Sequence, residues 1–214
     1  MSFFRLIDKG NYPQRLFVGG MHGKESFSTI NALKKIQSFN VKNGKLIIYN
    51  CDQSKYISTL DKRYYNTKTG IEILRLIKYY HPDMYIETHC YNPKNYKNLI
   101  DEHRKEKVGV PPLIELEKGV LIGSVSPHIR TNEFKRENVC LTLEMPCFHQ
   151  KSDKKRNNFQ KQKESFEIYL KILKIVAGSE SRSDLEKKIS EDYPKQFETA
   201  RNYAKEFFGK YPPF

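Results

Sequence analysis

The chain has 214 residues, 38% hydrophobic and 29% charged, so it is long enough for one domain with a full hydrophobic core. No apolar run approaches the roughly 20 residues needed to cross a bilayer, and the charged N-terminal segment 1–8 is too short for a secretory signal. This composition excludes a membrane span and predicts a cytoplasmic protein with no membrane partner.

The net charge of +13 is compatible with nucleic-acid binding or with an anionic substrate. The lysines are spread along the chain, and only the segment 151–163 is a dense basic run. Because no nucleic-acid reader motif or stacking pattern accompanies this run, we interpret the charge as a solvated basic surface. Nucleic-acid binding remains an alternative.

The four cysteines lie far apart and form no CxxC pair. In a cytosolic chain this spacing predicts small buried thiols rather than a disulfide framework or a cysteine-based zinc site. The residues are Cys51, Cys90, Cys140 and Cys147.

Predicted strands and helices alternate through the first half of the chain. Short apolar runs predict buried strands, and apolar residues at helical spacing predict helices. In order these are a strand at 16–18, a helix at 26–38, a strand at 45–49, a helix at 70–80 capped by Thr69, and a strand at 84–89. This alternation is typical of an α/β domain with a mixed, mostly parallel central sheet and helices on both faces.

The second half ends in a helical region. We expect a surface helix at 96–107, strands or edges at 110–115 and 119–123, a loop at 124–130, and a strong strand at 138–144 broken by Pro146. Helices then follow within 158–208. Because no repeat or long linker interrupts the chain, we expect residues 1–214 to form a single domain with the C-terminal helices packed on the sheet.

Histidine and carboxylate side chains stand where predicted strands end. His22 and Glu25 follow the turn at Gly19 and Gly20, and His89 ends the strand at 84–89. The carboxyl ends of parallel strands meet at one edge of a sheet, so these side chains are predicted to converge. Two imidazoles and one carboxylate suit a Zn²⁺ ion with an open position, which would activate water and polarise a carbonyl group.

Glu144, at the end of the strand at 138–144, is the candidate general base of such a site. A carboxylate there can take a proton from water and pass it to a leaving amine. His128 and Arg130 lie in the loop that precedes this strand. They belong either to the pocket rim or to a solvated loop.

These residues resemble a known family. Residues 19–25, Gly-Gly-Met-His-Gly-Lys-Glu, are similar to the metal motif GGxHGxE of the succinylglutamate desuccinylase/aspartoacylase family, within the zinc carboxypeptidase superfamily. Residues 87–89 fall where that family has Asp-Leu-His, and residues 141–144 resemble the strand of its catalytic glutamate. The resemblance covers residues 15–148 and implies a zinc-carboxypeptidase-like fold.

The resemblance implies a role for each matched residue. His22, Glu25 and His89 would hold one zinc ion, and Glu144 would activate water. Residues 50–63 are similar to the family pattern Asn-Pro…Arg-Tyr-Ile…Asp-Leu-Asn-Arg. Arg63 would then clamp a substrate carboxylate, which a guanidinium binds through two hydrogen bonds.

The substrate clamp departs from the family pattern. Lys55 stands where the family has an arginine that stabilises the oxyanion. A lysine ammonium is a compact charge and cannot form the two parallel hydrogen bonds that a planar guanidinium forms. Lys62 replaces the family's asparagine, Leu60 its aspartate, and Glu87 the aspartate before the metal-binding histidine. The metal ligands and the base match, whereas the residues that would recognise the substrate differ.

Together these features predict a zinc-dependent hydrolase that cleaves an amide bond in a small, carboxylate-bearing substrate, as a deacylase or a carboxypeptidase. Two alternatives remain. One is a non-catalytic member of the same fold that binds a metal or a ligand, favoured by the altered clamp at Lys55 and Lys62. The other is a basic nucleic-acid-binding protein, favoured by the net charge of +13.

Overall fold

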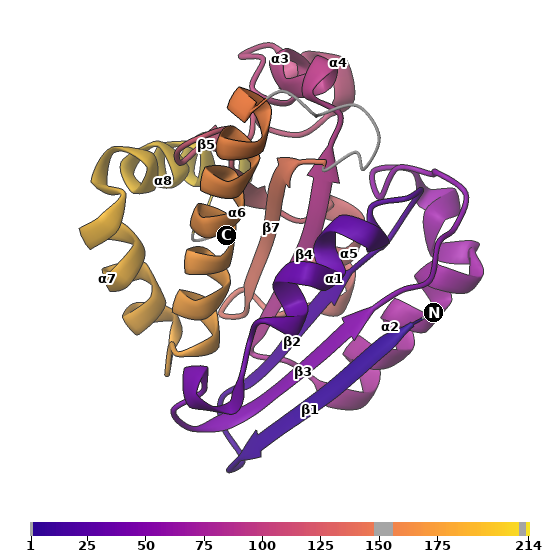
Figure 1. The fold of residues 1–214 in the computed structure, drawn as a ribbon, viewed down its shortest axis with the longest axis vertical. Coiled ribbons are helices and arrows are strands. Elements are labelled where there is room, and N and C mark those ends of the chain that lie inside the picture. The colour runs from indigo at the N-terminus through magenta and orange to yellow at the C-terminus, as the bar shows by residue number, and fades with distance from the viewer. Residues whose placement is uncertain (1, 148–155, 210–212) are drawn as a thin grey trace.

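A seven-stranded mixed sheet forms the centre of the protein (Figure 1). The computed structural model describes residues 2–147, 156–209 and 213–214. The strands are β1 (Phe3–Lys9), β2 (Gln14–Gly19), β3 (Gly44–Asn50), β4 (Met84–Tyr91), β5 (Ile114–Glu115), β6 (Leu121–Ser124) and β7 (Val139–Pro146). Their order across the sheet is β1-β3-β2-β4-β7-β6-β5.

The sheet is parallel at its centre and antiparallel towards both edges. Strands β3, β2, β4 and β7 run parallel to one another. Strand β1 pairs antiparallel with β3, and β6 pairs antiparallel with both β7 and β5. The prediction of a mixed sheet is confirmed, but the expectation of a mostly parallel one holds only for its centre. Strand β1 was not predicted, because as an edge strand it exposes Phe4 and Leu6 and has no continuous buried run.

Helices cover both faces of the sheet. They are α1 (Ser26–Lys34), α2 (Lys68–Tyr80), α3 (Tyr96–Leu99), α4 (Arg104–Val108), α5 (Pro127–Glu133), α6 (Arg156–Ala177), α7 (Arg182–Asp192) and α8 (Pro194–Phe208). Short 3-10 turns span Ser38–Asn40, Lys62–Asn66 and Pro93–Asn95. Among the described residues, no helix is long and apolar enough to cross a membrane.

Three local expectations need correction. The segment 124–130 is not only a loop, because Ser126 caps helix α5 and Pro127 occupies its first turn, where a missing N–H is tolerated. The segment 96–107 contains the two short helices α3 and α4. Helix α2 is capped by Thr67 rather than Thr69, since the Thr67 hydroxyl accepts a hydrogen bond from the backbone N–H of Gly70.

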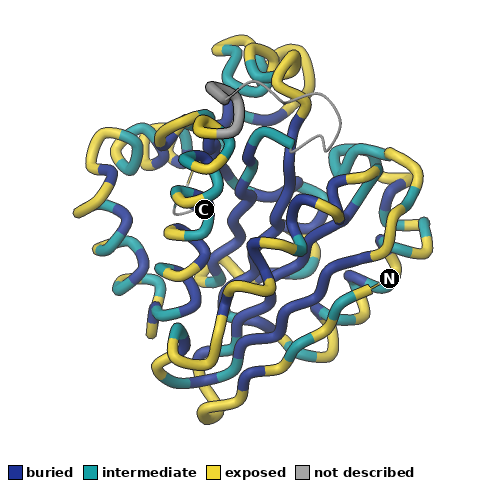
Figure 2. The backbone as a smooth tube through the Cα atoms, viewed as in Figure 1, coloured by how far each residue is buried: buried dark blue, intermediate teal, exposed yellow. Residues whose placement is uncertain are grey.

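Two hydrophobic clusters lie on opposite faces of the sheet, and the central strands are buried on both sides (Figure 2). Strand side chains alternate between the clusters, so Phe17 lies in one cluster and its neighbour Leu16 in the other. The first cluster receives side chains from α1, α6, α7 and α8, and the second from α2 and α5. The C-terminal helices therefore pack on the sheet, as expected.

Cys90 and Cys147 form a disulfide, so the prediction of free thiols was wrong for this pair. Cys90 lies near the end of β4, and Cys147 directly follows the adjacent parallel strand β7. Their Cα atoms are 4.9 Å apart although 57 positions separate them in the chain. Only the pairing of β4 with β7 brings them together. Cys51 and Cys140 are buried and free, as predicted.

We expect Cys147→Ser to lower the free energy of unfolding by about 2–4 kcal/mol, because the disulfide restricts the unfolded chain. Denaturant unfolding with and without a reducing agent would measure this. The reducing agent should destabilise the wild-type protein to the same extent and leave Cys147→Ser unchanged. Equal stability of the oxidised wild type and the variant would contradict the expectation.

Candidate active site

The turn that carries His22 and Glu25 requires glycine at its first two positions. A Cβ atom on Gly19 would lie 2.5 Å from the Thr88 hydroxyl oxygen, and one on Gly20 would lie 2.7 Å from the carbonyl oxygen of Cys51. Gly20 also has a positive φ of 66°, which glycine adopts without strain. The turn can therefore pass closely between β3 and β4 before helix α1 begins.

Asn50, at the end of β3, supports the start of helix α1. Its side-chain oxygen accepts a hydrogen bond from the Thr29 hydroxyl at 2.7 Å, and its amide donates to the backbone carbonyl of Ser26 at 3.4 Å. All three residues are buried. The position of Glu25, which directly precedes α1, is thus fixed by contacts from the neighbouring strand.

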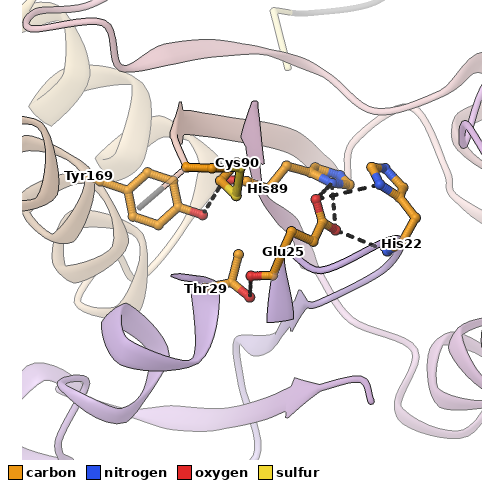
Figure 3. The surroundings of a disulfide bond; sticks show 7 residues. His22, Glu25, Thr29, His89, Cys90 and Tyr169 are labelled. Carbon is orange, nitrogen blue, oxygen red and sulfur yellow. Dashed lines mark hydrogen bonds and ion pairs between the residues drawn. A yellow bond between two sulfur atoms is a disulfide. The ribbon is translucent and has the colours of Figure 1, made fainter. Parts of the chain in front are cut away.

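The Glu25 carboxylate contacts two imidazole rings, those of His22 and His89 (Figure 3). Its oxygens lie 3.2 and 3.3 Å from Nδ1 of His89, and Oε2 lies 3.5 Å from Nδ1 of His22. The backbone N–H of His22 also donates to Oε1 at 3.1 Å. The two rings are stacked, with centroids 5.0 Å apart. The predicted convergence of His22, Glu25 and His89 is present in the structure.

The geometry of these three side chains fits a single metal ion. One ligand atom from each residue lies within 4.8 Å of the other two. Ligand atoms about 2.0–2.2 Å from one Zn²⁺ ion lie no more than about 4.4 Å apart, so small side-chain rotations suffice to complete the coordination. Two nitrogens and one oxygen leave a fourth tetrahedral position open.

Glu87 is a second carboxylate on His89, and its role was not predicted from the sequence. Its Oε2 lies 3.4 Å from Nε2 of His89, on the opposite side of the ring from Glu25, and its Oε1 accepts a hydrogen bond from the Tyr85 hydroxyl at 3.1 Å. A carboxylate on the outer nitrogen fixes the tautomer and orientation of a metal-binding histidine. The alternation along β4, which puts Tyr85, Glu87 and His89 on one face, could have indicated this role.

The buried charges shift the pKa values of the site in different directions. Burial lowers the pKa of His22, which keeps its ring neutral and able to bind a metal. Burial also disfavours the charged form of His89, but Glu25 and Glu87 outweigh it and raise the His89 pKa well above its ordinary value. A metal ion at this site would replace the proton on Nδ1 of His89.

Glu144 lies directly beside His89, because the two residues are paired in the parallel register of β4 and β7. Its Oε2 is buried and has no hydrogen-bond partner among the described residues. Burial raises the pKa of Glu144 to about 7, although His89 and Arg104 favour its charged form. A carboxyl group with this pKa can gain and lose a proton near neutral pH.

A cavity of about 240 Å³ opens in front of these side chains. His22, His89, Glu87 and Glu144 line it together with Arg104 of α4. Further walls come from Tyr56, from Arg130 of α5, and from Ala200, Tyr203 and Ala204 of α8. The helical C-terminal region, for which the sequence indicated no functional role, thus contributes to the cavity wall.

Two predicted site residues lie outside this lining. The Arg63 side chain is 85% exposed, and its Nε donates to Asp61 at 3.0 Å. Lys55 is exposed in a segment without regular secondary structure. Neither belongs to the described residues that line the cavity. His128 also lies outside the lining, with Nε2 3.2 Å from the carbonyl oxygen of Leu60, whereas Arg130 lines the cavity.

Residues 10–209 match the protein family described as "Uncharacterized protein conserved in archaea (DUF2119)". The chain belongs to this family. It is 36% identical over 208 residues to a protein of Methanocaldococcus jannaschii with the name "Uncharacterized protein MJ0501", and the match covers 93% of each chain. The comparison with solved structures found no significant match.

With His22, Glu25 and His89 as zinc ligands, as the sequence predicts, Glu87→Gln should weaken zinc binding about 10–100-fold, the usual effect of losing the carboxylate behind a histidine ligand. The glutamine keeps the size of the side chain but removes its charge. Competition with a chelating dye would measure the affinity. Glu102→Gln, at an exposed position, provides a control that should bind zinc like the wild type. Equal affinities for all three proteins would exclude this role of Glu87.

The stability of the metal-free protein should depend on pH, because the pKa of Glu144 is raised in the folded state. A folded-state pKa of about 7, above the ordinary 4.5, means that the folded protein holds this proton more tightly than the unfolded chain. The stabilisation is therefore complete below about pH 4.5 and is lost as the pH rises through 7. Glu144→Gln stays neutral, so in the presence of a chelator its stability should rise relative to wild type by at most about 3 kcal/mol between pH 5 and 8. Parallel melting-temperature curves for the two proteins would contradict the raised pKa.

Proposed function

We propose that the protein is a zinc-dependent hydrolase that cleaves an amide bond in a small, carboxylate-bearing substrate. The observation that carries this proposal is the arrangement around one cavity. His22, Glu25 and His89 converge at one point, and Glu144, whose Oε2 has no hydrogen-bond partner among the described residues, lies beside His89. The reaction is of the deacylase or carboxypeptidase type.

His22, Glu25 and His89 would hold the metal ion, with Glu87 orienting His89 from its outer nitrogen. When bound, Zn²⁺ supplies a Lewis acid that activates water and polarises a carbonyl oxygen. The buried surroundings of the site support this role, because electrostatic interactions are stronger where water is largely excluded.

Glu144 acts as the general base and then as the general acid. Its carboxylate takes a proton from the attacking water and passes that proton to the amine that leaves. Both transfers need a carboxyl group whose pKa lies near the working pH, and burial moves the pKa of Glu144 in that direction. Glu144 lies on β7, and a strand fixes a carboxylate more firmly than a loop would.

The chain order of the site also supports a zinc-carboxypeptidase-like fold. The turn with His22 and Glu25 follows β2, His89 lies near the end of the neighbouring strand β4, and Glu144 lies near the end of β7. All three strands are parallel, so their carboxyl ends share one edge of the sheet. This agrees with the succinylglutamate desuccinylase/aspartoacylase resemblance of residues 15–148.

A non-catalytic protein that binds a metal or a ligand at the same site is the second candidate. It is favoured by the positions of Arg63 and Lys55, which lie outside the cavity lining although the resemblance would use them on the substrate. The two candidates share the metal ligands and differ in whether Glu144 transfers a proton. Turnover by zinc-loaded wild-type protein, and its loss on substitution of Glu144, therefore distinguishes them.

Glu144→Gln should lower kcat about 10²–10⁴-fold, the usual contribution of a general acid–base group, and should leave the zinc content unchanged. The assay would follow hydrolysis of a panel of N-acyl amino acids by zinc-loaded protein, with metal content measured on the same samples. His22→Ala should lose metal and activity together. Zinc-loaded wild-type protein that hydrolyses no member of the panel would favour the non-catalytic candidate, and loss of zinc from Glu144→Gln would make Glu144 a ligand.

A further inference from the structure

We propose that Arg104 binds the carboxylate of the substrate, the role that the family resemblance gives to Arg63. This inference rests on the function proposed above, because the hydrolase needs a residue that recognises the negative charge of its substrate. Arg104 is the first residue of α4 and lies in the segment between β4 and β5. The cavity is lined by Arg104 and by the site residues His89 and Glu144.

The cavity contains negative charge that an anionic substrate has to overcome. Glu87 and Glu144 both line it, and each would repel a carboxylate if no cation were nearby. Arg104 is close enough to Glu144 for each residue to favour the charged form of the other. A guanidinium at this position can offset the repulsion and form two hydrogen bonds to a planar carboxylate.

Arg104 and Arg130 are the arginines among the described cavity-lining residues, and their guanidinium groups make different contacts. The Arg130 guanidinium donates to the backbone carbonyls of Lys135, Arg136 and Asn138, so it holds the segment that joins α5 to β7. Arg104 is half-buried, and its Nη1 donates to the carbonyl oxygen of Pro111 at 2.7 Å. That bond holds Nη1, while Nε and Nη2 make no hydrogen bond to any described residue and can bind a ligand.

The surroundings of Arg104 indicate the class of substrate. Apolar side chains of Leu99, Val110 and Leu113 line the same cavity as Arg104. A charged group beside apolar surface suits a molecule whose carboxylate is attached to a hydrophobic group. N-acyl derivatives of apolar amino acids have this form, with the scissile amide adjacent to the carboxylate.

The test compares two probes, N-acetyl-leucine and its uncharged carboxamide, by calorimetry with metal-free and with zinc-loaded protein. The wild type should bind the acid more tightly than the carboxamide. Arg104→Gln should weaken binding of the acid about tenfold to hundredfold, the range for a hydrogen bond to a charged group, and leave the carboxamide unaffected. Arg104→Lys should bind the acid more tightly than Arg104→Gln but less tightly than the wild type, because lysine keeps the positive charge but cannot form two parallel hydrogen bonds to a carboxylate. Arg63→Gln is the matched control and should bind both probes like the wild type.

Several results would overturn the inference. A wild type that does not prefer the acid, equal binding of the acid by wild type and Arg104→Gln, or a loss confined to Arg63→Gln would each do so. An equal loss for both probes in Arg104→Gln would show that Arg104 only supports the fold of its segment. The binding measurement is independent of turnover. An Arg104-dependent preference for the acid without hydrolysis would therefore contradict the hydrolase function and leave the role of Arg104 in anion binding intact.

Discussion

The contact between the Glu25 carboxylate and the His89 ring is the interaction on which the rest of the site depends. It joins the turn after β2 to the end of β4, and both partners are buried. A buried carboxylate is costly unless it is paired, so the two imidazoles around Glu25 stabilise its charge in the absence of a metal. The same pairing holds three potential metal ligands together in advance, which lowers the cost of organising them when an ion binds.

The pairing of β4 with β7 positions the fourth functional group. Because side chains alternate along a strand, Glu87 and His89 share one face of the sheet with Glu144, whereas Cys90 packs into the cluster on the other face. The disulfide between Cys90 and Cys147 thus connects the ends of β4 and β7 on the face of the sheet opposite to these side chains. The buried Tyr169 of α6 adds a hydrogen bond from its hydroxyl to the His89 carbonyl at 3.3 Å (Figure 3). Glu144 and His89 are therefore held at a fixed separation by contacts that lie outside the cavity.

The proposed metal-binding and substrate-binding residues come from different parts of the fold. The proposed ligands and base stand at the ends of central parallel strands, where the backbone is rigid. Arg104 and the apolar side chains near it belong to the segment between β4 and β5, and α8 supplies another wall of the cavity. Loops can change without disturbing the sheet, so such a division allows one metal site to serve different substrates. The exposed positions of Lys55 and Arg63 are consistent with recognition by another segment.

The sequence alone determined the local features of this protein. Apolar runs and helical spacing predicted the four central strands and most of the helices, because buried elements carry a strong periodic signal. The glycine pair before His22, and histidine or glutamate at three strand ends, predicted that His22, Glu25, His89 and Glu144 come together at one edge of the sheet. Edge strand β1 and helix α5 lacked that signal, since β1 is half exposed and α5 is defined by the Ser126 cap and Pro127.

The tertiary structure decided which distant residues meet. The Cys90–Cys147 pair and the position of Arg104 at the cavity both depend on strand order, register and the path of the chain between strands. Neither follows from local composition, because a cysteine or an arginine has the same sequence signal whether it is exposed or in contact with a site. Arg63 matched a family pattern and yet lies on the surface beside Asp61, because a sequence pattern specifies residue order but not the direction in which a side chain points.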